Sequence, residues 1–217
     1  MTEILLIRHG ETAWNAEKRL QGHLDIPLNA EGRRQAAALG RALLSEELDA
    51  IVSSDLLRAR QTAQEIAAPR GMVVQVEPGL RERCFGAFEG LLYEEIGGRF
   101  PEAYAAWKTR DIDARFPQGE RSAETLREFA ERAVGTVMRL VGRHRGCRIA
   151  LVSHGGVLEC VYRAAQGMGF AHARDFDIFN ASINRFHCDG VTLRMAQWGD
   201  IAHLQPADGL VMDEIDR

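Results

Sequence analysis

Short apolar runs alternate with longer amphipathic stretches along most of this chain, and this alternation restricts the fold more than any other feature of the sequence. The apolar runs carry the β-branched and aliphatic residues of buried strands, and the longer stretches place apolar residues at helical spacing. Asn29 and Ser122 are suitable N-caps for two of these helices. A sheet whose strands are separated by helices is mostly parallel and is covered on both faces. The predicted strands are 3–8, 50–53, 72–76 and 148–152, and the predicted helices are 30–47, 55–68, 122–144 and 156–166.

The C-terminal part of the chain has a different pattern. Asp189-Gly190 separates two strand-like runs, 183–188 and 191–197, which is the signal of a tight antiparallel hairpin. We therefore expect an α/β fold, a three-layer α/β/α sandwich with a mostly parallel central sheet and an antiparallel edge. The 217 residues contain no repeat and no Pro/Ser-rich linker, so we expect a single domain over 1–217.

Composition excludes several classes of protein. The net charge of −4 disfavours nucleic acid as the main partner, because proteins that bind the phosphate backbone usually present a basic face. No apolar run approaches the ~20 residues of a membrane-spanning helix, and the first residues lack the basic stretch of a secretory signal. The four cysteines form no CxxC pair. This spacing favours free thiols and a cytoplasmic location.

Cationic and nucleophilic side chains follow three of the predicted strands. Arg8 and His9 end the first strand, Arg58 lies one helical turn beyond the second, and His154 follows the fourth. Ligands of α/β sheets bind beyond the carboxyl ends of the strands. The arginine fork binds phosphate oxygens, and a neutral imidazole is a good nucleophile near neutral pH. The set predicts an anion-binding site that contains a nucleophile.

Each of these residues has a plainer interpretation when it is taken alone. Arg58 and Arg60 are also compatible with the solvated face of a helix. A metal site built from His9, His23 and His154 is a further alternative, although no pair of them has the spacing of metal ligands. Apart from His9 and His154, the histidines are interpreted as core or surface residues when the metal site is set aside: His23, His144, His172, His187 and His203.

Six segments of the sequence resemble, in order, the motifs of the histidine phosphatase superfamily, in its phosphoglycerate-mutase-like branch. The set is specific because the motifs occur together and in the family's order, whereas a single Arg-His-Gly is a weak signal. The segments are ILLIRHGETAWN at 4–15, RLQGHLDIPL at 19–28, SDLLRARQTA at 54–63, LRERCFGAFEG at 80–90, VSHGGVL at 152–158 and GDIAHL at 199–204.

The resemblance implies a phosphomonoesterase that forms a phosphohistidine. His9 would attack phosphorus, and Arg8, Arg58 and His154 would hold the equatorial oxygens. Glu82 would protonate the leaving group and then activate water. We expect a protonated His154 and a neutral His9, because the arginines make a second imidazolium costly. The residues alone do not choose Glu82 over its neighbours, since Glu89, Glu94 and Glu95 lie in the same segment.

The resemblance also implies the rest of the site. Asn15, Gln21, Gly22 and Gly155 match positions that contact the substrate or its phosphate, and 85–120 matches a substrate-facing insert. No metal and no cofactor is implied, and the expected partner is a small-molecule phosphate ester. The substrate specificity is expected to come from the insert and the C-terminal tail. A homodimer formed through an edge strand is a further family-level expectation.

The same family contains mutases, which return the phosphoryl group to a bound sugar acid. Here Cys84-Phe85-Gly86 follows Glu82 in place of the mutases' Tyr-containing stretch, and no Arg-Arg pair occurs between Glu82 and Ser153. Both features favour a phosphatase over a cofactor-dependent phosphoglycerate mutase-type phosphotransferase. A binding domain with an inactive phosphate pocket is disfavoured because all five catalytic positions are filled. The basic residues still able to bind an acidic substrate are Arg99, Lys108, Arg110, Arg115 and Arg121.

Overall fold

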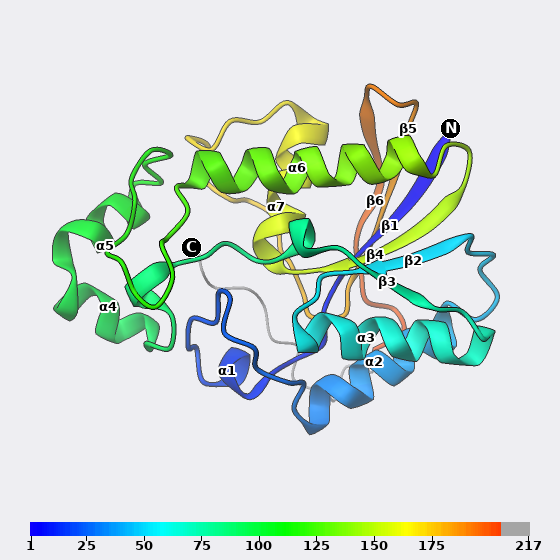
Figure 1. The fold of residues 1–217 in the computed structure, drawn as a ribbon, viewed down its shortest axis with the longest axis horizontal. Coiled ribbons are helices and arrows are strands. Elements are labelled where there is room, and N and C mark those ends of the chain that lie inside the picture. The colour runs from blue at the N-terminus through cyan, green and yellow to red at the C-terminus, as the bar shows by residue number, and fades with distance from the viewer. Residues whose placement is uncertain (205–217) are drawn as a thin grey trace.

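The computed structural model describes residues 1–204, and they form a mixed sheet between two layers of helices (Figure 1). The strand order is β3-β2-β4-β1-β5-β6. The first four strands in this order are parallel, and β5 runs antiparallel to both β1 and β6. The predicted fold class is therefore confirmed. The strands are β1 Thr2–Arg8, β2 Ala50–Ser53, β3 Val74–Val76, β4 Arg148–Ser153, β5 Ile183–Cys188 and β6 Leu193–Asp200.

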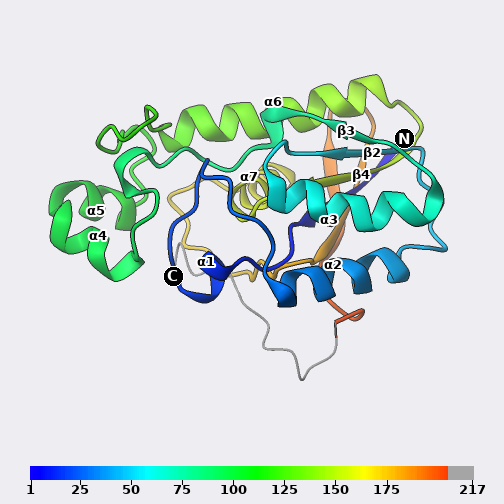
Figure 2. The ribbon, with the colours of Figure 1, turned by 60° about the horizontal axis from the view of Figure 1, so that its bottom comes forward.

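Two helices cover each face of the sheet, and Figure 2 shows α2 and α3 on one side and α6 on the other. None of the helices within residues 1–204 has both the length and the apolar character needed to cross a membrane. The helices are α1 Ala13–Ala16, α2 Ala30–Ala42, α3 Leu57–Ala67, α4 Tyr93–Arg99, α5 Pro101–Lys108, α6 Leu126–Arg143 and α7 Gly155–Gln166, with 3-10 turns at Ala68–Arg70, Pro78–Leu80 and Gly86–Phe88.

The alternation of side chains along β1 divides the core into two halves. Ile4 and Leu6 pack against α6 and α7, whereas Leu5 and Ile7 pack against α2 and α3. All four side chains are essentially inaccessible to solvent, and each such burial stabilises the fold by roughly 1.5–3 kcal/mol. The apolar run at residues 4–7 of β1 is thus explained, because helices cover both faces of the strand.

Several helix boundaries differ from the predictions, and a local capping box decides one of them. The longest helix is capped by Thr125, which forms a capping box with Glu128, and not by Ser122. Helix α3 starts at Leu57 and not at Asp55, since the Asp55 carboxylate accepts a hydrogen bond from Arg81 Nε at 2.7 Å. The helix predicted to reach residue 47 ends at Ala42. The second hairpin strand spans Leu193–Asp200, later than the predicted 191–197.

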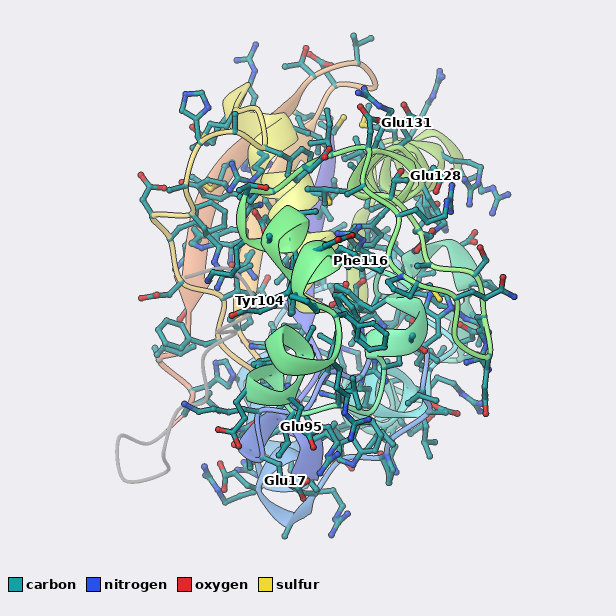
Figure 3. All side chains as sticks on the ribbon, turned by 90° about the vertical axis from the view of Figure 1, so that its left-hand side faces the viewer. Glu17, Glu95, Tyr104, Phe116, Glu128 and Glu131 are labelled. Atoms are coloured by element: carbon teal, nitrogen blue, oxygen red, sulfur yellow. The ribbon has the colours of Figure 1, made fainter. Side chains whose placement is uncertain are left out.

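Residues 85–120 form a separate lobe beside the sheet, at the left of Figure 1 and facing the viewer in Figure 3, where Tyr104 and Phe116 are labelled. The lobe has its own aromatic core, in which Phe88 and Phe116 stack with ring centroids 4.5 Å apart. Helices α4 and α5 pack on this core. These two helices are the α-helical part of the segment.

Candidate active site

The predicted site residues converge at the carboxyl ends of β1 and β4, where Arg8 pairs in register with Ser153. The ring of His154 lies edge-on against that of His9, with centroids 5.1 Å apart. Leu20, Phe85 and Tyr93 complete the wall of the cleft, and no signal in a single sequence marks them for this role. The cleft is lined by eight of the nine predicted residues: Arg8, His9, Asn15, Gln21, Gly22, Arg58, Glu82 and Gly155.

The hydrogen bonds of His9 fix its tautomer. Its Nδ1 lies 2.7 Å from the carbonyl oxygen of Gly10, and a carbonyl only accepts, so Nδ1 carries the proton and Nε2 keeps its lone pair. Burial lowers the pKa of His9 well below its usual value, and the charges of Arg58 and Arg8 lower it further. The imidazole is therefore neutral, as expected, and its Nε2 is a nucleophile at neutral pH.

The glycine after His9 allows the backbone of its loop to pack closely against α2. A Cβ on Gly10 would lie 2.5 Å from the carbonyl oxygen of Gly32, at the start of α2, and a Cβ on Gly32 would lie 1.9 Å from the carbonyl oxygen of Glu11. The loop that carries His9 thus lies directly against α2. Asn180 holds the same loop from the other side, because its Nδ2 donates to the carbonyl oxygen of His9 at 3.0 Å.

Two buried arginines supply the fixed positive charge of the cleft. Arg58 donates from Nη2 to the carbonyl of Gly22 at 2.8 Å and from Nη1 to that of Leu24 at 2.9 Å. Arg8 donates from Nη1 to the carbonyl of Ile178 at 2.7 Å. Burial lowers the pKa of Arg58 to about 10, so it remains charged at neutral pH. The interpretation of Arg58 as part of a solvated helix face is wrong, whereas Arg60 is indeed exposed.

The structure indicates a neutral imidazole at His154, in place of the protonated one expected from the sequence. Burial and the charge of Arg58 lower the pKa of His154 well below its usual value, so it is neutral among the protein's own groups. Its Nε2 lies 2.8 Å from Ser54 Oγ, a contact that the sequence did not reveal. Its Nδ1 has no hydrogen-bond partner within residues 1–204. A phosphate dianion beside it would favour the charged form.

The structure distinguishes Glu82 from the neighbouring glutamates. Its Oε1 accepts from the Arg83 backbone N–H at 2.8 Å and its Oε2 from that of Gly156 at 3.0 Å. Glu89 instead braces two loops, because its Oε1 accepts from the backbone N–H groups of His23 and Phe85. Of the glutamates in this segment, Glu82 is the one that lines the cleft as described over residues 1–204.

Asn15 and Gln21 border the cleft, and hydrogen bonds with Thr12 orient their side-chain amides. Asn15 Oδ1 accepts from the Thr12 backbone N–H, and Gln21 Oε1 accepts from the Thr12 hydroxyl. Because each amide oxygen is engaged by Thr12, each NH₂ group is available to donate to an anion. Gly22 has φ +50°, and a Cβ there would lie 2.1 Å from Glu89 Oε1, so this turn requires glycine.

Metal-ligating side chains are not grouped in the part of the chain that the structure describes. Across residues 1–204, no cluster of three or more His, Cys, Asp or Glu side chains has a geometry suited to a metal ion. His23, one member of the alternative metal site, directs its Nε2 to the carbonyl oxygen of Glu82 at 2.8 Å. It acts as a support for the acid-bearing loop.

We expect Gly156→Ala to lower activity and also to lower stability, because a Cβ here would lie 3.0 Å from two ring atoms of the buried Phe129 side chain. A Cβ at this position would lie 2.3 Å from Glu82 Oε1, so the carboxylate must move, and a misplacement of this size costs on the order of 100-fold in rate. The higher helix propensity of alanine, about 1 kcal/mol, offsets part of the loss of stability. Steady-state kinetics and thermal unfolding check both effects. Gly135→Ala, where a Cβ meets open space, is the control, and unchanged kcat/KM in Gly156→Ala would contradict the geometry.

Comparison with known proteins agrees with this arrangement. A family model described as the histidine phosphatase superfamily (branch 1) matches residues 4–201. Phosphoglycerate mutase-like protein 4 of Arabidopsis thaliana is 41% identical over 207 residues, which are 94% of this chain and 87% of the relative. The metal-independent phosphoserine phosphatase of Arabidopsis thaliana is 37% identical over 207 residues, 94% of this chain and 84% of that protein.

A solved structure gives the same picture of the fold. YhfR of Bacillus stearothermophilus superposes with a TM-score of 0.86 at 33% identity, covering 94% of this chain and 100% of that one. The family model begins at the first residue of the predicted 4–15 motif and extends past the fold's last strand. The chain therefore belongs to the histidine phosphatase superfamily, in its branch 1.

Proposed function

We propose that this protein hydrolyses small phosphate monoesters through a phosphohistidine at His9. One observation carries the proposal: a buried, neutral imidazole, whose Nδ1 is held by the Gly10 carbonyl so that Nε2 keeps its lone pair, lines the same cleft as two buried arginines. This arrangement combines an activated nucleophile with fixed positive charge for the phosphoryl oxygens. The relative named a metal-independent phosphoserine phosphatase makes a phosphorylated amino acid the first natural ester to test.

The first step transfers the phosphoryl group to His9. The Nε2 lone pair forms a bond to phosphorus while the ester P–O bond breaks, and that electron pair goes to the leaving oxygen, which takes a proton from Glu82. Arg8 and Arg58 bind the equatorial oxygens, and His154 donates from Nδ1 once it is protonated. Catalysis depends on positioned charge, as is general for phosphoryl transfer.

The second step returns His9 to its starting state. The Glu82 carboxylate accepts a proton from water, whose oxygen bonds to phosphorus as the P–N bond breaks. The electron pair of that bond returns to Nε2. Asn15 and Gln21 border the same cleft and donate to the phosphoryl oxygens from their amide NH₂ groups. No step requires a metal or a cofactor.

The organic part of the ester occupies the side of Glu82 that faces the insert. A second cavity of about 40 Å³ adjoins the phosphate cleft there and shares Glu82 and Phe85 with it. Rings of Trp107 and Phe116 and the guanidinium of Arg83 line this cavity. Residues 85–120 thus act as the substrate-facing insert of a single domain over 1–217. The tail proposed to share this role lies mostly at 205–217, outside the described residues.

Three of the four basic residues in the insert are paired with carboxylates, which favours hydrolysis over mutase transfer. Arg110 lines the second cavity but is bound to the Glu159 carboxylate, and Arg115 is bound to Glu128. Arg99 is paired with Glu95. A mutase needs a firm grip on the substrate's carboxylate to retain the phosphoenzyme for transfer.

We therefore expect net release of inorganic phosphate and little interconversion of 2- and 3-phosphoglycerate, even with the bisphosphate primer. Both reactions are measured on one enzyme preparation, with phosphoserine and p-nitrophenyl phosphate as further substrates. A preparation that releases phosphate demonstrates active enzyme and serves as its own control. Isomer conversion faster than phosphate release by orders of magnitude would show that the protein is a mutase and not a phosphatase.

The cellular setting of the protein is also part of the proposal. All four cysteines are free in the structure, which suits the expected cytoplasmic location. The expected homodimer would use an edge of the sheet, and β3 and β6 are the edge strands. Both statements, like the expectation that nucleic acid is not a partner, remain predictions.

A further inference from the structure

One arginine of α6, Arg132, donates three hydrogen bonds to backbone carbonyls of the segment that carries Glu82 and two to the carboxylate of Glu124. Arg132 Nε and Nη2 each donate to the Glu124 carboxylate at 2.7 Å. Nη1 donates to the carbonyl oxygens of Gly79 at 3.0 Å and Arg81 at 2.9 Å, and Nη2 also donates to that of Glu82 at 3.0 Å. All five N–H groups of the side chain are therefore satisfied.

Glu124 extends this bracing to the residues after Glu82. Its Oε2 accepts from the Cys84 backbone N–H at 2.9 Å, and its carbonyl accepts from Arg83 Nε at 3.0 Å. The Arg132–Glu124 pair thus holds the chain on both sides of the acid. No motif in the sequence singles out either residue.

Glu82 depends on this support because its own segment has no regular structure beyond a single 3-10 turn, Pro78–Leu80. Loop residues are positioned less firmly than residues in helices or strands. The carboxylate itself is held by the backbone N–H groups of Arg83 and Gly156, and it reaches Gly156 only when the backbone of Glu82 stays in place. A shift of the backbone would move the proton donor away from the leaving oxygen.

A second arginine of α6 shows what a merely structural pair looks like. Arg127 makes a two-pronged pair with Asp113, and both side chains are at least half exposed (51% and 65%). Exposed pairs of this kind contribute little to stability. Arg132 differs because three of its five bonds go to backbone carbonyls next to the acid.

We infer that Arg132 is a positioning residue for proton transfer: it sets the place of Glu82 through the carbonyls of residues 79–82. The inference rests on the proposed function, in which Glu82 is the proton donor. Replacing Arg132 then has the effect of a partial loss of Glu82, and kcat/KM falls most for esters whose leaving group needs a proton. A general structural role would lower activity on all esters equally.

The test compares two substrates on each enzyme preparation. β-Glycerol phosphate has an alkoxide leaving group that needs protonation, and p-nitrophenyl phosphate has one that needs little. The ratio of their kcat/KM values does not depend on how much of the preparation is folded, so a poorly folding variant remains informative. Arg132→Met is the main variant, Arg132→Lys the conservative one, and Arg127→Met the matched control.

We expect the glycerol phosphate to p-nitrophenyl phosphate ratio to fall about 10-fold or more in Arg132→Met, to fall less in Arg132→Lys, and to stay at the wild-type value in Arg127→Met. In a Glu82→Gln background, Arg132→Met should leave the ratio unchanged, because the proton donor is already lost. A ratio that stays constant in Arg132→Met, or that falls again in the double variant, would overturn the inference. A wild-type enzyme that hydrolyses neither ester would overturn the proposed function itself and this inference with it.

Discussion

Replacing His9 with alanine lowers kcat/KM by about 10⁵-fold or more, the scale seen when a covalent nucleophile is removed. His9 lines the cleft, and its Nε2 keeps a lone pair because Nδ1 is held by the Gly10 carbonyl. The neighbouring His154 is held at Nε2 by Ser54. Steady-state kinetics with p-nitrophenyl phosphate measure the loss.

Two controls separate this effect from a loss of folding. His172→Ala changes an exposed histidine and should leave kcat/KM unchanged. His9→Ala itself should still bind inorganic phosphate, because Arg8 and Arg58 remain in place. A His9→Ala enzyme with substantial turnover would assign the nucleophile to another residue.

Glu82→Gln produces a loss that depends on the leaving group. Glutamine has nearly the same shape but donates no acidic proton, so β-glycerol phosphate should lose about 10²–10⁴-fold in kcat/KM and p-nitrophenyl phosphate far less. Any loss common to both substrates comes from the two backbone N–H groups of Arg83 and Gly156, which each donate to a different carboxylate oxygen. Glutamine has one accepting oxygen and an NH₂ group that only donates, so one of the two loses its acceptor.

Glu89→Gln is the matched control for this substitution. The Glu89 carboxylate accepts from His23 and Phe85 through one oxygen, which the glutamine oxygen can replace, so both substrates should be affected equally and weakly. Equal losses on both esters in Glu82→Gln, with a selective loss in Glu89→Gln, would transfer the acid role to Glu89.

Residues at strand ends were predictable because the sheet gathers them. Arg8 and His154 follow apolar runs that read as buried strands, and parallel strands bring their carboxyl ends to one edge. Their convergence in the structure follows from the β1–β4 register. The resemblance to a family added Glu82, which lies in an irregular segment where periodicity carries no information.

Features set by tertiary contacts were not predictable from one sequence. The N-cap of α6 is an exception, because Thr125 and Glu128 have the Thr-x-x-Glu spacing of a capping box, which the sequence itself contains and Ser122 lacks. The neutral state of His154 depends on complete burial beside Arg58, and burial is a property of the fold. Arg132 is an ordinary helix residue in the sequence, and its contacts with residues 79–82 appear only in three dimensions.

The central claim is that the phosphoryl group passes from the ester to His9 and then to water. Rapid quenching of the wild-type enzyme with a labelled ester, followed by peptide mapping, tests this claim most directly. The account predicts one acid-labile, base-stable phosphoryl group, located on the peptide with Arg8-His9-Gly10 and lost to inorganic phosphate at least as fast as kcat. A label on another residue, or turnover with no labelled enzyme, would contradict it.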